Sequence, residues 1–306
     1  MNAYHVPVLA MEAIDFLLER GAGLFLDATV GGGGHALLLL ERCPECRVLA
    51  VDRDPEAIAT ARRRLDRYRD RVRFLATRFD RATDDIEVRD RGLDGALLDL
   101  GVSSHQLDEE DRGFTFRRGA PLDMRMTPEG PTAADLLAEA SEEELARIFR
   151  EYGEERHARR LARAIVRQRR QAPITTSDVL VGVIDSALRG RVEVQDRARI
   201  FQALRIAVNG EIDALEAALP VIRDRLNEDG VLVVIAYHSI EDRIVKNAFR
   251  DWSRSCVCPP GLPICVCRGV PLGETLTRRP VRPSEDEVER NPRARSARLR
   301  AWRKAA

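Results

Sequence analysis

A glycine-rich loop between two acidic residues has the residue types of a ligand site. Residues 31–35 read GGGGH and follow an apolar run that ends at Asp27. A second apolar run ends at Asp52, 19 positions after Gly33. Glycines let a ligand approach the backbone closely, and an acid at the end of the second run accepts hydrogen bonds from ribose hydroxyls. The loop alone would indicate only a tight turn, but with the spaced acid it predicts a site for a nucleoside-containing cofactor.

The acidic residues also favour one cofactor over another. A dinucleotide such as NAD would place its pyrophosphate over the loop, where neighbouring carboxylates would repel it. S-adenosylmethionine carries a positive sulfonium and an ammonium group, which Asp27 and Asp99 would attract. We therefore expect S-adenosylmethionine as the cofactor.

Asp99 is the candidate for orienting a substrate. It lies in DGALLDLGVSS, residues 94–104, where amino-group methyltransferases place an acceptor for the target amine, although their Asp-Pro-Pro-aromatic or Ser-Pro-Pro-aromatic sequence is absent. The lone pair of an exocyclic amine is delocalised into its ring, so a site must align the amine with the methyl group and accept its hydrogen bonds. Methylation at C5 of a pyrimidine would need a cysteine, typically after a proline, and the chain has no Pro-Cys pair. Taken alone, Asp99 could equally cap a helix.

Three further residues are candidates for the reaction. His238 and Ser239 directly follow the last apolar run, so we expect them in the same crevice as Asp99, where His238 could orient a base or relay its proton. Asp123, in the sequence PLDMRM, is a candidate substrate contact. The alternative interpretations are structural: His238 would cap the next helix, and Asp123 would form an ion pair with Arg125 that holds its loop.

Five apolar runs of strand length must position these residues. They alternate with helical patterns, and continuous apolar runs are typical of parallel strands that are buried on both faces. Ligands bind such sheets at the carboxyl ends of the strands. The sequence therefore predicts an α/β fold with a Rossmann-like parallel sheet. The runs lie in residues 24–27, 47–52, 72–79, 94–104 and 230–239.

A long insertion separates the fourth run from the fifth. It has about 130 residues, whereas such connections usually have a handful. Ser141 followed by three glutamates is typical of a helix start, and TTSDVLVGVIDSAL and IFQALRIAVNGEIDALEAALPVI have helical apolar spacing. We predict one domain at residues 1–107 and 219–306, and an inserted, mainly helical substrate-recognition domain at residues 108–218.

The charge is balanced overall but concentrated locally. Fifty basic and fifty acidic residues give a net charge of zero, which argues against a uniformly basic nucleic-acid-binding surface. Residues 156–170 and 290–304 nevertheless carry seven basic residues each and no acidic residue. These stretches suit contacts with phosphates, although a solvated helix face is the common alternative.

The cysteines are interpreted from the expected compartment. No apolar stretch approaches the roughly 20 residues of a membrane-spanning helix, and the first residues lack a signal sequence, so we expect a cytoplasmic protein without a membrane partner. There cysteines are typically thiols or metal ligands rather than disulfides. Two C-x-C pairs with prolines between them could turn four thiolates toward one zinc ion, but this spacing is less diagnostic than C-x-x-C, and the metal stays an open alternative. The paired cysteines are Cys256, Cys258, Cys265 and Cys267, and we interpret Cys43 and Cys46 as structural.

Motifs along nearly the whole length are similar to those of a known family. They are HVPVL, GGGGH, AVDRDPEAI, LLDLGVSS with QLD, RGFTF, PLDMRM, YGEER with ARAIV, FQALRI with VN, HSIEDRIVK and NPRARS. With these motifs the chain resembles the bacterial RsmH/MraW family of small-subunit (16S) ribosomal RNA cytosine-N4 methyltransferases. Some positions depart from the family pattern: His105 stands where proline is usual, Gly119-Ala120 replaces Asp-Gly, and Gln195-Asp196 replaces His-Pro. These departures concern the substrate loops more than the cofactor site.

The resemblance implies a fold, a reaction and partners. The fold would be that of class I S-adenosylmethionine-dependent methyltransferases with a helical insertion. The enzyme would methylate the N4 amine of a cytidine in the decoding region of small-subunit ribosomal RNA, within the ribosomal subunit. Apart from the resemblance, we assign no metal to the active site, and a homodimer stays an open alternative. The alternatives are a DNA amino-methyltransferase and a non-catalytic RNA-binding factor of ribosome assembly.

The resemblance also implies the cofactor contacts. Asp52 would hold the ribose, and Phe79 would pack on the adenine, although the residues alone favour an ordinary core aromatic at Phe79. Carried over to this sequence, the whole set of cofactor contacts is Gly33, Gly34, His35, Asp52, Phe79, Asp99 and Gln106.

Overall fold

The chain forms two compact units in a computed structural model. The structure describes residues 7–102, 109, 112–115, 117–188, 192–258, 264, 266–267 and 269–306. One unit comprises Met1–Gly101 and Asp213–Ala306, and the other comprises Val102–Ile212. The observed boundaries lie before residues 102 and 213. The predicted boundaries, before residues 108 and 219, each lie six residues further along the chain. Near the second boundary, one helix ends at Asn209, Gly210 follows with a left-handed backbone, and the next helix begins at Glu211. The apolar spacing in the sequence continues across this break, so the sequence did not show it.

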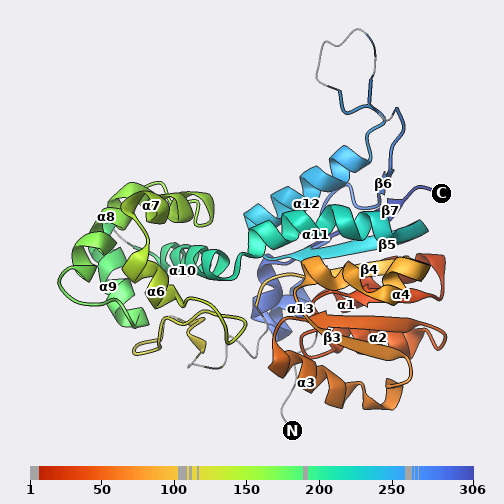
Figure 1. The fold of residues 1–306 in the computed structure, drawn as a ribbon, viewed down its shortest axis with the longest axis horizontal. Coiled ribbons are helices and arrows are strands. Elements are labelled where there is room, and N and C mark those ends of the chain that lie inside the picture. The colour runs from red at the N-terminus through yellow and green to blue at the C-terminus, as the bar shows by residue number, and fades with distance from the viewer. Residues whose placement is uncertain are drawn as a thin grey trace. The chain divides into compact units, whose positions relative to one another are not determined.

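The first unit contains a seven-stranded sheet with the order β3-β2-β1-β4-β5-β7-β6 (Figure 1). The first five strands along this order are parallel, so the predicted parallel sheet is confirmed. Strand β7 pairs antiparallel with β5 and with β6, and neither β6 nor β7 was predicted. The strands are β1 (Leu24–Asp27), β2 (Arg47–Asp52), β3 (Val72–Ala76), β4 (Leu93–Asp99), β5 (Leu226–Ala236), β6 (Gly273–Thr275) and β7 (Arg298–Lys304).

Both faces of this sheet are apolar, because successive side chains point to opposite sides of a strand and consecutive residues of these strands are apolar. In β5, Val231 and Val233 join one core cluster, and Leu232 and Val234 join the other. The first cluster includes residues of α1 (Ala10–Leu17), α2 (Gly34–Arg42) and α3 (Pro55–Arg64), and the second includes residues of α4 (Ile86–Arg91), α11 (Glu211–Arg225) and α12 (Ser239–Trp252). Continuous apolar runs therefore gave the correct prediction of a sheet with helices on both sides. The unit also contains α13 (Glu285–Arg290), η1 (Leu18–Arg20), η2 (Asp66–Tyr68), η3 (Phe79–Asp84) and η5 (Pro292–Ser296).

The second unit is helical and has its own apolar core. Ser141 accepts a hydrogen bond from the Glu144 N–H, as expected for the predicted helix start. Asn209 is buried and fixes the loop PLDMRM, because its side chain donates to Met124 O and accepts from Met126 N. The helices are α6 (Ala133–Glu139), α7 (Glu142–Glu151), α8 (Ala158–Arg169), α9 (Ser177–Ala187) and α10 (Val194–Asn209).

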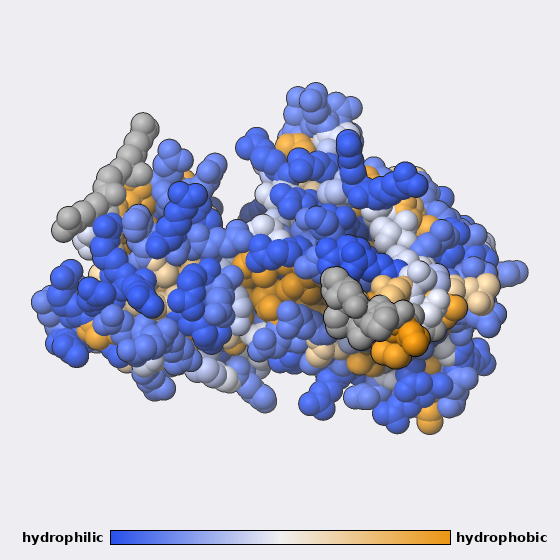
Figure 2. All heavy atoms as spheres, turned by 90° about the horizontal axis from the view of Figure 1, so that it is seen from above, coloured by the Kyte–Doolittle hydropathy of each residue, from blue (hydrophilic) through white to orange (hydrophobic). Residues whose placement is uncertain are grey.

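Figure 2 shows a mainly hydrophilic surface with small apolar areas, and no helix in the described part of the chain is long and apolar enough to cross a membrane.

Cys43 and Cys46 form a disulfide, with Cα atoms 5.3 Å apart, at the end of α2. The expectation that the cysteines are thiols or metal ligands is therefore wrong for this pair. Both residues are buried where the chain turns into β2, which brings the two sulfurs together.

Candidate active site

Three acidic residues meet at one edge of the sheet. Asp27, Asp52 and Asp99 are the last residues of β1, β2 and β4. These strands are parallel neighbours in the order β2-β1-β4. Because the carboxyl ends of parallel strands lie at the same edge, the three carboxylates gather next to the glycine loop that follows β1.

The glycine loop folds back onto the end of β2. Gly31 has a left-handed backbone, with φ 50°, and donates its N–H to Asp52 Oδ2 at 2.9 Å. Gly34 begins α2, and a Cβ atom there would lie 3.0 Å from Pro7 Cγ. Glycine is therefore needed both for the turn and for the close approach of the chain. Burial raises the pKa of Asp52, and the backbone N–H groups of Asp54 and Gly31 oppose this shift.

Asp27 is the most deeply buried of the three acids, with 4% of its surface exposed. Its Oδ1 accepts a long hydrogen bond from Thr29 N at 3.4 Å, and its Oδ2 has no hydrogen-bond partner in the described structure. Burial raises the pKa of Asp27 from 3.8 to about 7, and the proximity of His35 opposes this shift. An unsatisfied buried carboxylate oxygen is costly, and it fits a site that a cationic ligand completes.

Asp99 is held from two sides and is only half-buried. The hydroxyl of Tyr237 donates to Asp99 Oδ1 at 2.8 Å, and the Asp99 N–H donates to Thr29 Oγ1 at 2.6 Å. Burial and the nearby Asp99 charge raise the pKa of Tyr237 well above its usual range, so the phenol keeps its proton and remains a donor. Tyr237 was not among the predicted site residues. The available signal was its position directly after β5, at the same edge as Asp99.

His35 is a buried neutral residue next to this pair. Burial lowers its pKa. Its Nε2 lies 3.0 Å from Val8 O, and a carbonyl can only accept, so Nε2 carries the proton. Nδ1 then lacks a proton. It lies 3.8 Å from Asp99 Oδ2, but a neutral imidazole does not form an ion pair with a carboxylate. His35 therefore fastens the segment at Val8 to the glycine loop.

His238 caps a helix, as the structural alternative predicted. It is the N-cap of α12, and its Nδ1 accepts from Glu241 N at 3.4 Å. Its Nε2 lies 3.1 Å from Glu241 Oε1, but not at a hydrogen-bonding angle. Ser239 is the first residue of α12. Both residues follow β5 and lie at the same sheet edge as Asp99, as expected from the sequence.

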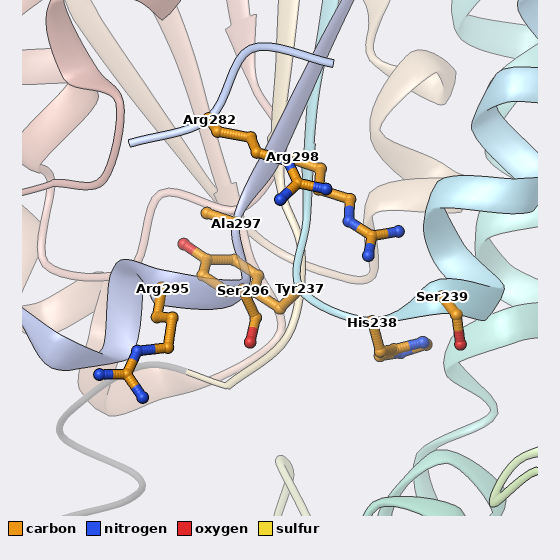
Figure 3. A pocket seen from close by; sticks show the side chains of 8 residues that line it. All are labelled: Tyr237, His238, Ser239, Arg282, Arg295, Ser296, Ala297 and Arg298. Atoms are coloured by element: carbon orange, nitrogen blue, oxygen red, sulfur yellow. The ribbon is translucent and has the colours of Figure 1, made fainter. Parts of the chain in front are cut away.

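A basic pocket adjoins these residues. It has a volume of about 350 Å³ and is lined by Tyr237, His238, Ser239, Arg282, Arg295, Ser296, Ala297 and Arg298 (Figure 3). Arg298 also pairs with Asp242 Oδ2 at 3.2 Å. Within the described residues, Arg282 and Arg295 form no ion pair. With cationic side chains and no carboxylate in its wall, the pocket suits an anionic group such as a phosphate.

Asp123 lies in the second unit and has a structural role there. The Arg125 guanidinium donates to both carboxylate oxygens of Asp123 at 2.8 Å. Burial acts to raise the pKa of Asp123, but the hydrogen bonds from Arg125 outweigh it and lower the pKa. Arg125 also donates to Pro128 O and Gly130 O. This bidentate pair holds the loop, as the alternative interpretation stated.

All the expected cofactor contacts remain predictions, among them Phe79 and Gln106. Phe79 begins η3 directly after the loop that follows β3, and its half-buried ring packs against the core. This partly buried environment is the one expected for the core aromatic that the residues alone favoured. Gln106 lies outside the described residues.

The two arginine-rich stretches differ in structure. In α8, Arg159, Arg163 and Arg167 lie on one exposed face, and Leu161 and Ile165 are buried on the other. The stretch at 290–304 instead makes contacts inside its own unit. In it Arg300 is buried against Asp242, Arg303 pairs with Glu274, and the Lys304 ammonium donates to Leu226 O. Most of the stretch at 290–304 therefore stabilises the fold through contacts within its unit, whereas the arginine face of α8 and Arg295 are exposed.

Comparison with known sequences extends over the whole chain. A sequence profile described as the MraW methylase family matches residues 2–305. Similar relatives include Ribosomal RNA small subunit methyltransferase H of Gemmatimonas aurantiaca, 54% identical over 308 residues, with 99% of this chain and 96% of the relative covered. The protein of the same name from Symbiobacterium thermophilum is 49% identical over 310 residues, with 98% and 96% covered.

Solved structures show weaker similarity. An rRNA methylase from Streptococcus thermophilus has a TM-score of 0.45 and 11% identity, with 99% of each chain covered. The N-methyltransferase NodS from Bradyrhizobium japonicum has a TM-score of 0.42 and 10% identity, with 97% of this chain and 94% of that chain covered.

Proposed function

The chain belongs to the MraW methylase family, and from this premise we propose that it methylates the N4 amine of a cytidine in the decoding region of small-subunit ribosomal RNA. The methyl donor in this proposal is S-adenosylmethionine, and the reaction takes place in the cytoplasm on the ribosomal subunit. The observation that carries the proposal is the edge of the sheet at which Asp27, Asp99 and Tyr237 lie beside the glycine loop.

The residues at this edge fit a nucleoside cofactor with a positive charge. The unsatisfied Oδ2 of buried Asp27 suits a cationic group. Asp52 ends β2 where a ribose is held in related folds, and Gly33, Gly34 and His35 form the loop beneath it. Phe79 and Gln106 are assigned to the adenine end on the family pattern. When bound, S-adenosylmethionine supplies an electrophilic methyl group on a positively charged sulfur.

Asp99 is the proposed partner of the amine. It accepts a hydrogen bond from the N4 amine and thereby directs the nitrogen toward the methyl carbon. The nitrogen forms its bond to this carbon as the sulfur–carbon bond breaks, and then loses a proton, for which the Asp99 carboxylate is the nearest assigned acceptor. Tyr237 positions Asp99, because its hydroxyl fixes Oδ1 at 2.8 Å.

The basic pocket gives the RNA strand a place beside Asp99. Tyr237 contacts Asp99 and also lines the pocket, so a phosphate held by Arg282 and Arg295 would lie close to the reacting base. We assign His238 and Ser239 to the wall of this pocket, and the exposed arginine face of α8 to further phosphate contacts. Asp123 acts indirectly, through the loop that it holds with Arg125.

A transfer assay with three acceptors tests the proposal. Labelled S-adenosylmethionine is incubated with small subunits that lack the modification, with their naked RNA and with duplex DNA, and digested nucleosides are analysed by mass spectrometry. N4-methylcytidine from subunits or RNA is the expected result, and label only in DNA would replace the proposal with a DNA amino-methyltransferase. Asp99→Ala should abolish transfer while RNA binding persists. A chain that binds the cofactor and transfers nothing would be a non-catalytic assembly factor.

A further inference from the structure

The segment between α12 and β6 forms a loop that is closed at its base. Residue 252 ends α12, and β6 begins at residue 273. The Leu272 N–H donates to Trp252 O at 2.8 Å, and Ser253 Oγ lies 3.0 Å from Thr275 Oγ1. Two arms therefore leave the core of the unit side by side, and the described residues beyond this base need a source of order of their own.

Apolar burial does not supply that order. The described apolar side chains of the loop are largely in solvent, and Ile264 and Val266 are 74% and 78% exposed. A short segment without a hydrophobic core typically depends on disulfides or on a bound metal.

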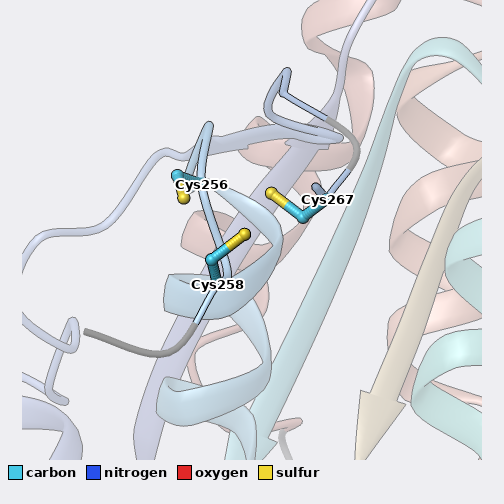
Figure 4. A group of neighbouring side chains, drawn as sticks. All are labelled: Cys256, Cys258 and Cys267. Atoms are coloured by element: carbon cyan, nitrogen blue, oxygen red, sulfur yellow. The ribbon is translucent and has the colours of Figure 1, made fainter. Parts of the chain in front are cut away.

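Three cysteines from the two arms converge in this loop (Figure 4). Cys256 and Cys258 lie on the arm that leaves α12, and Cys267 lies on the arm that returns to β6. Their Sγ atoms all lie within 4.8 Å of one another. A zinc–sulfur bond of about 2.3 Å places tetrahedral ligand sulfurs about 3.8 Å apart. The observed cluster therefore needs only small side-chain adjustments to surround one ion.

A backbone contact supports the same interpretation. The Val257 N–H, between the two cysteines of the first arm, donates to Cys267 Sγ at 3.3 Å. Hydrogen bonds of this kind, from a backbone N–H to a ligand atom, orient the ligands of metal sites. This hydrogen bond also joins the two arms directly.

We propose that Cys256, Cys258 and Cys267 bind one zinc ion that fastens the loop. Soft thiolate ligands select zinc over magnesium, calcium and manganese, and the binding free energy would hold the two arms of the loop together. Cys265 lies outside the described residues. Its place two positions before Cys267 makes it the sequence candidate for the fourth ligand, but the proposal requires only the three described thiolates. The site is separate from the methyl-transfer proposal, so either can fail without the other.

Metal analysis of the full chain tests the proposal. Protein purified without chelators and reconstituted anaerobically with zinc under reducing conditions should hold about one zinc per chain after desalting, by mass spectrometry of the metal. Cys267→Ser should lower this content at least tenfold. Ser255→Ala, an exposed neighbour that keeps the backbone carbonyl near Cys267, is the matched control and should retain the metal.

Cobalt gives a second readout that needs no variant. Cobalt added to the reduced wild-type chain should produce sulfur-to-metal charge-transfer absorption, which zinc should then displace. Wild-type protein that holds no zinc after reconstitution and gives no such absorption would overturn the proposal. Retention of zinc by a folded Cys267→Ser variant would also overturn it. Circular dichroism and cofactor binding establish that the variants are folded.

Discussion

The ends of β1 and β4 are neighbours in the sheet, but their acids are held very differently. Asp27 is buried with an unsatisfied oxygen and a pKa raised to about 7. Asp99 is half-buried and is fixed by the hydroxyl of Tyr237. The end of β1 therefore provides a carboxylate whose charge a cationic ligand can stabilise. The end of β4 provides a carboxylate that is oriented to accept a hydrogen bond. The difference indicates that the two carboxylates divide the work between the cofactor and the acceptor base.

Asp99→Asn should have the largest effect on turnover. The substitution keeps the size of the side chain but removes the carboxylate that orients the amine and accepts its proton. We expect a fall of about 10²- to 10³-fold in the single-turnover rate, with a much smaller change in cofactor affinity. Equal losses in both quantities would mean that Asp99 does not differ from Asp27 in its role.

Asp27→Asn should change the pH dependence of stability. In the folded, cofactor-free protein Asp27 keeps its proton up to about pH 7, whereas in the unfolded chain it ionises near 3.8. The unfolded chain binds fewer protons in this interval, so the free energy of unfolding contributed by Asp27 falls as the pH rises through it, by up to about 4 kcal/mol. Urea unfolding at several pH values measures this slope. Asp27→Asn should remove it, and the exposed control Asp90→Asn should keep it.

Cofactor affinity should follow the ionisation of Asp27 in the opposite direction. The charge that attracts a cationic ligand appears as the pH rises through about 7. Calorimetry should therefore show binding of S-adenosylmethionine that strengthens by roughly tenfold across this transition, with a proton released. In Asp27→Asn the affinity should be low and nearly independent of pH. A wild-type affinity without this dependence would assign the cationic groups to other residues.

Tyr237→Phe should produce a smaller loss. It removes one hydrogen bond to Asp99 but leaves the carboxylate in place, so we expect roughly a tenfold lower turnover number with KM nearly unchanged. The effect should disappear when the same change is made in Asp99→Asn, since the two residues act together. Independent, additive losses in the double variant would contradict a positioning role.

Arg295→Ala should have the smallest effect, and only on RNA. The loss of one phosphate contact should raise the KM for RNA by a few-fold and reduce the salt dependence of RNA binding by about one counterion. Cofactor binding should be unchanged. Arg303→Ala, in the same arginine-rich stretch but paired with Glu274, is the matched control and should leave the salt dependence intact.

The sequence predicted the parts of the sheet whose signal is local. Buried parallel strands are continuous apolar runs, so five strands, and the acids that end three of them, could be found in the sequence. Strand β7 was missed because arginines alternate with its apolar residues, and one of them, Arg300, is buried only through its ion pair with Asp242.

Two other features were missed for different reasons. The hydrogen bond between Tyr237 and Asp99 joins residues 138 positions apart, and only the position of Tyr237 directly after a predicted strand could have indicated it. The disulfide of Cys43 and Cys46 was missed because the expected compartment, rather than the turn between them, was used to interpret the pair.

The position of β7 has a consequence for synthesis of the protein. Among the described strands, β6 pairs only with β7, and β7 is also the strand that covers the outer edge of β5. Residues 298–304 follow all other strands in the sequence, so a chain growing from its N-terminus exposes the open edge of β5 until they emerge. An exposed strand edge invites pairing with other chains. A nascent chain that stops before residue 298 would therefore be a substrate for chaperones or proteases, although every acid of the candidate active site is already present.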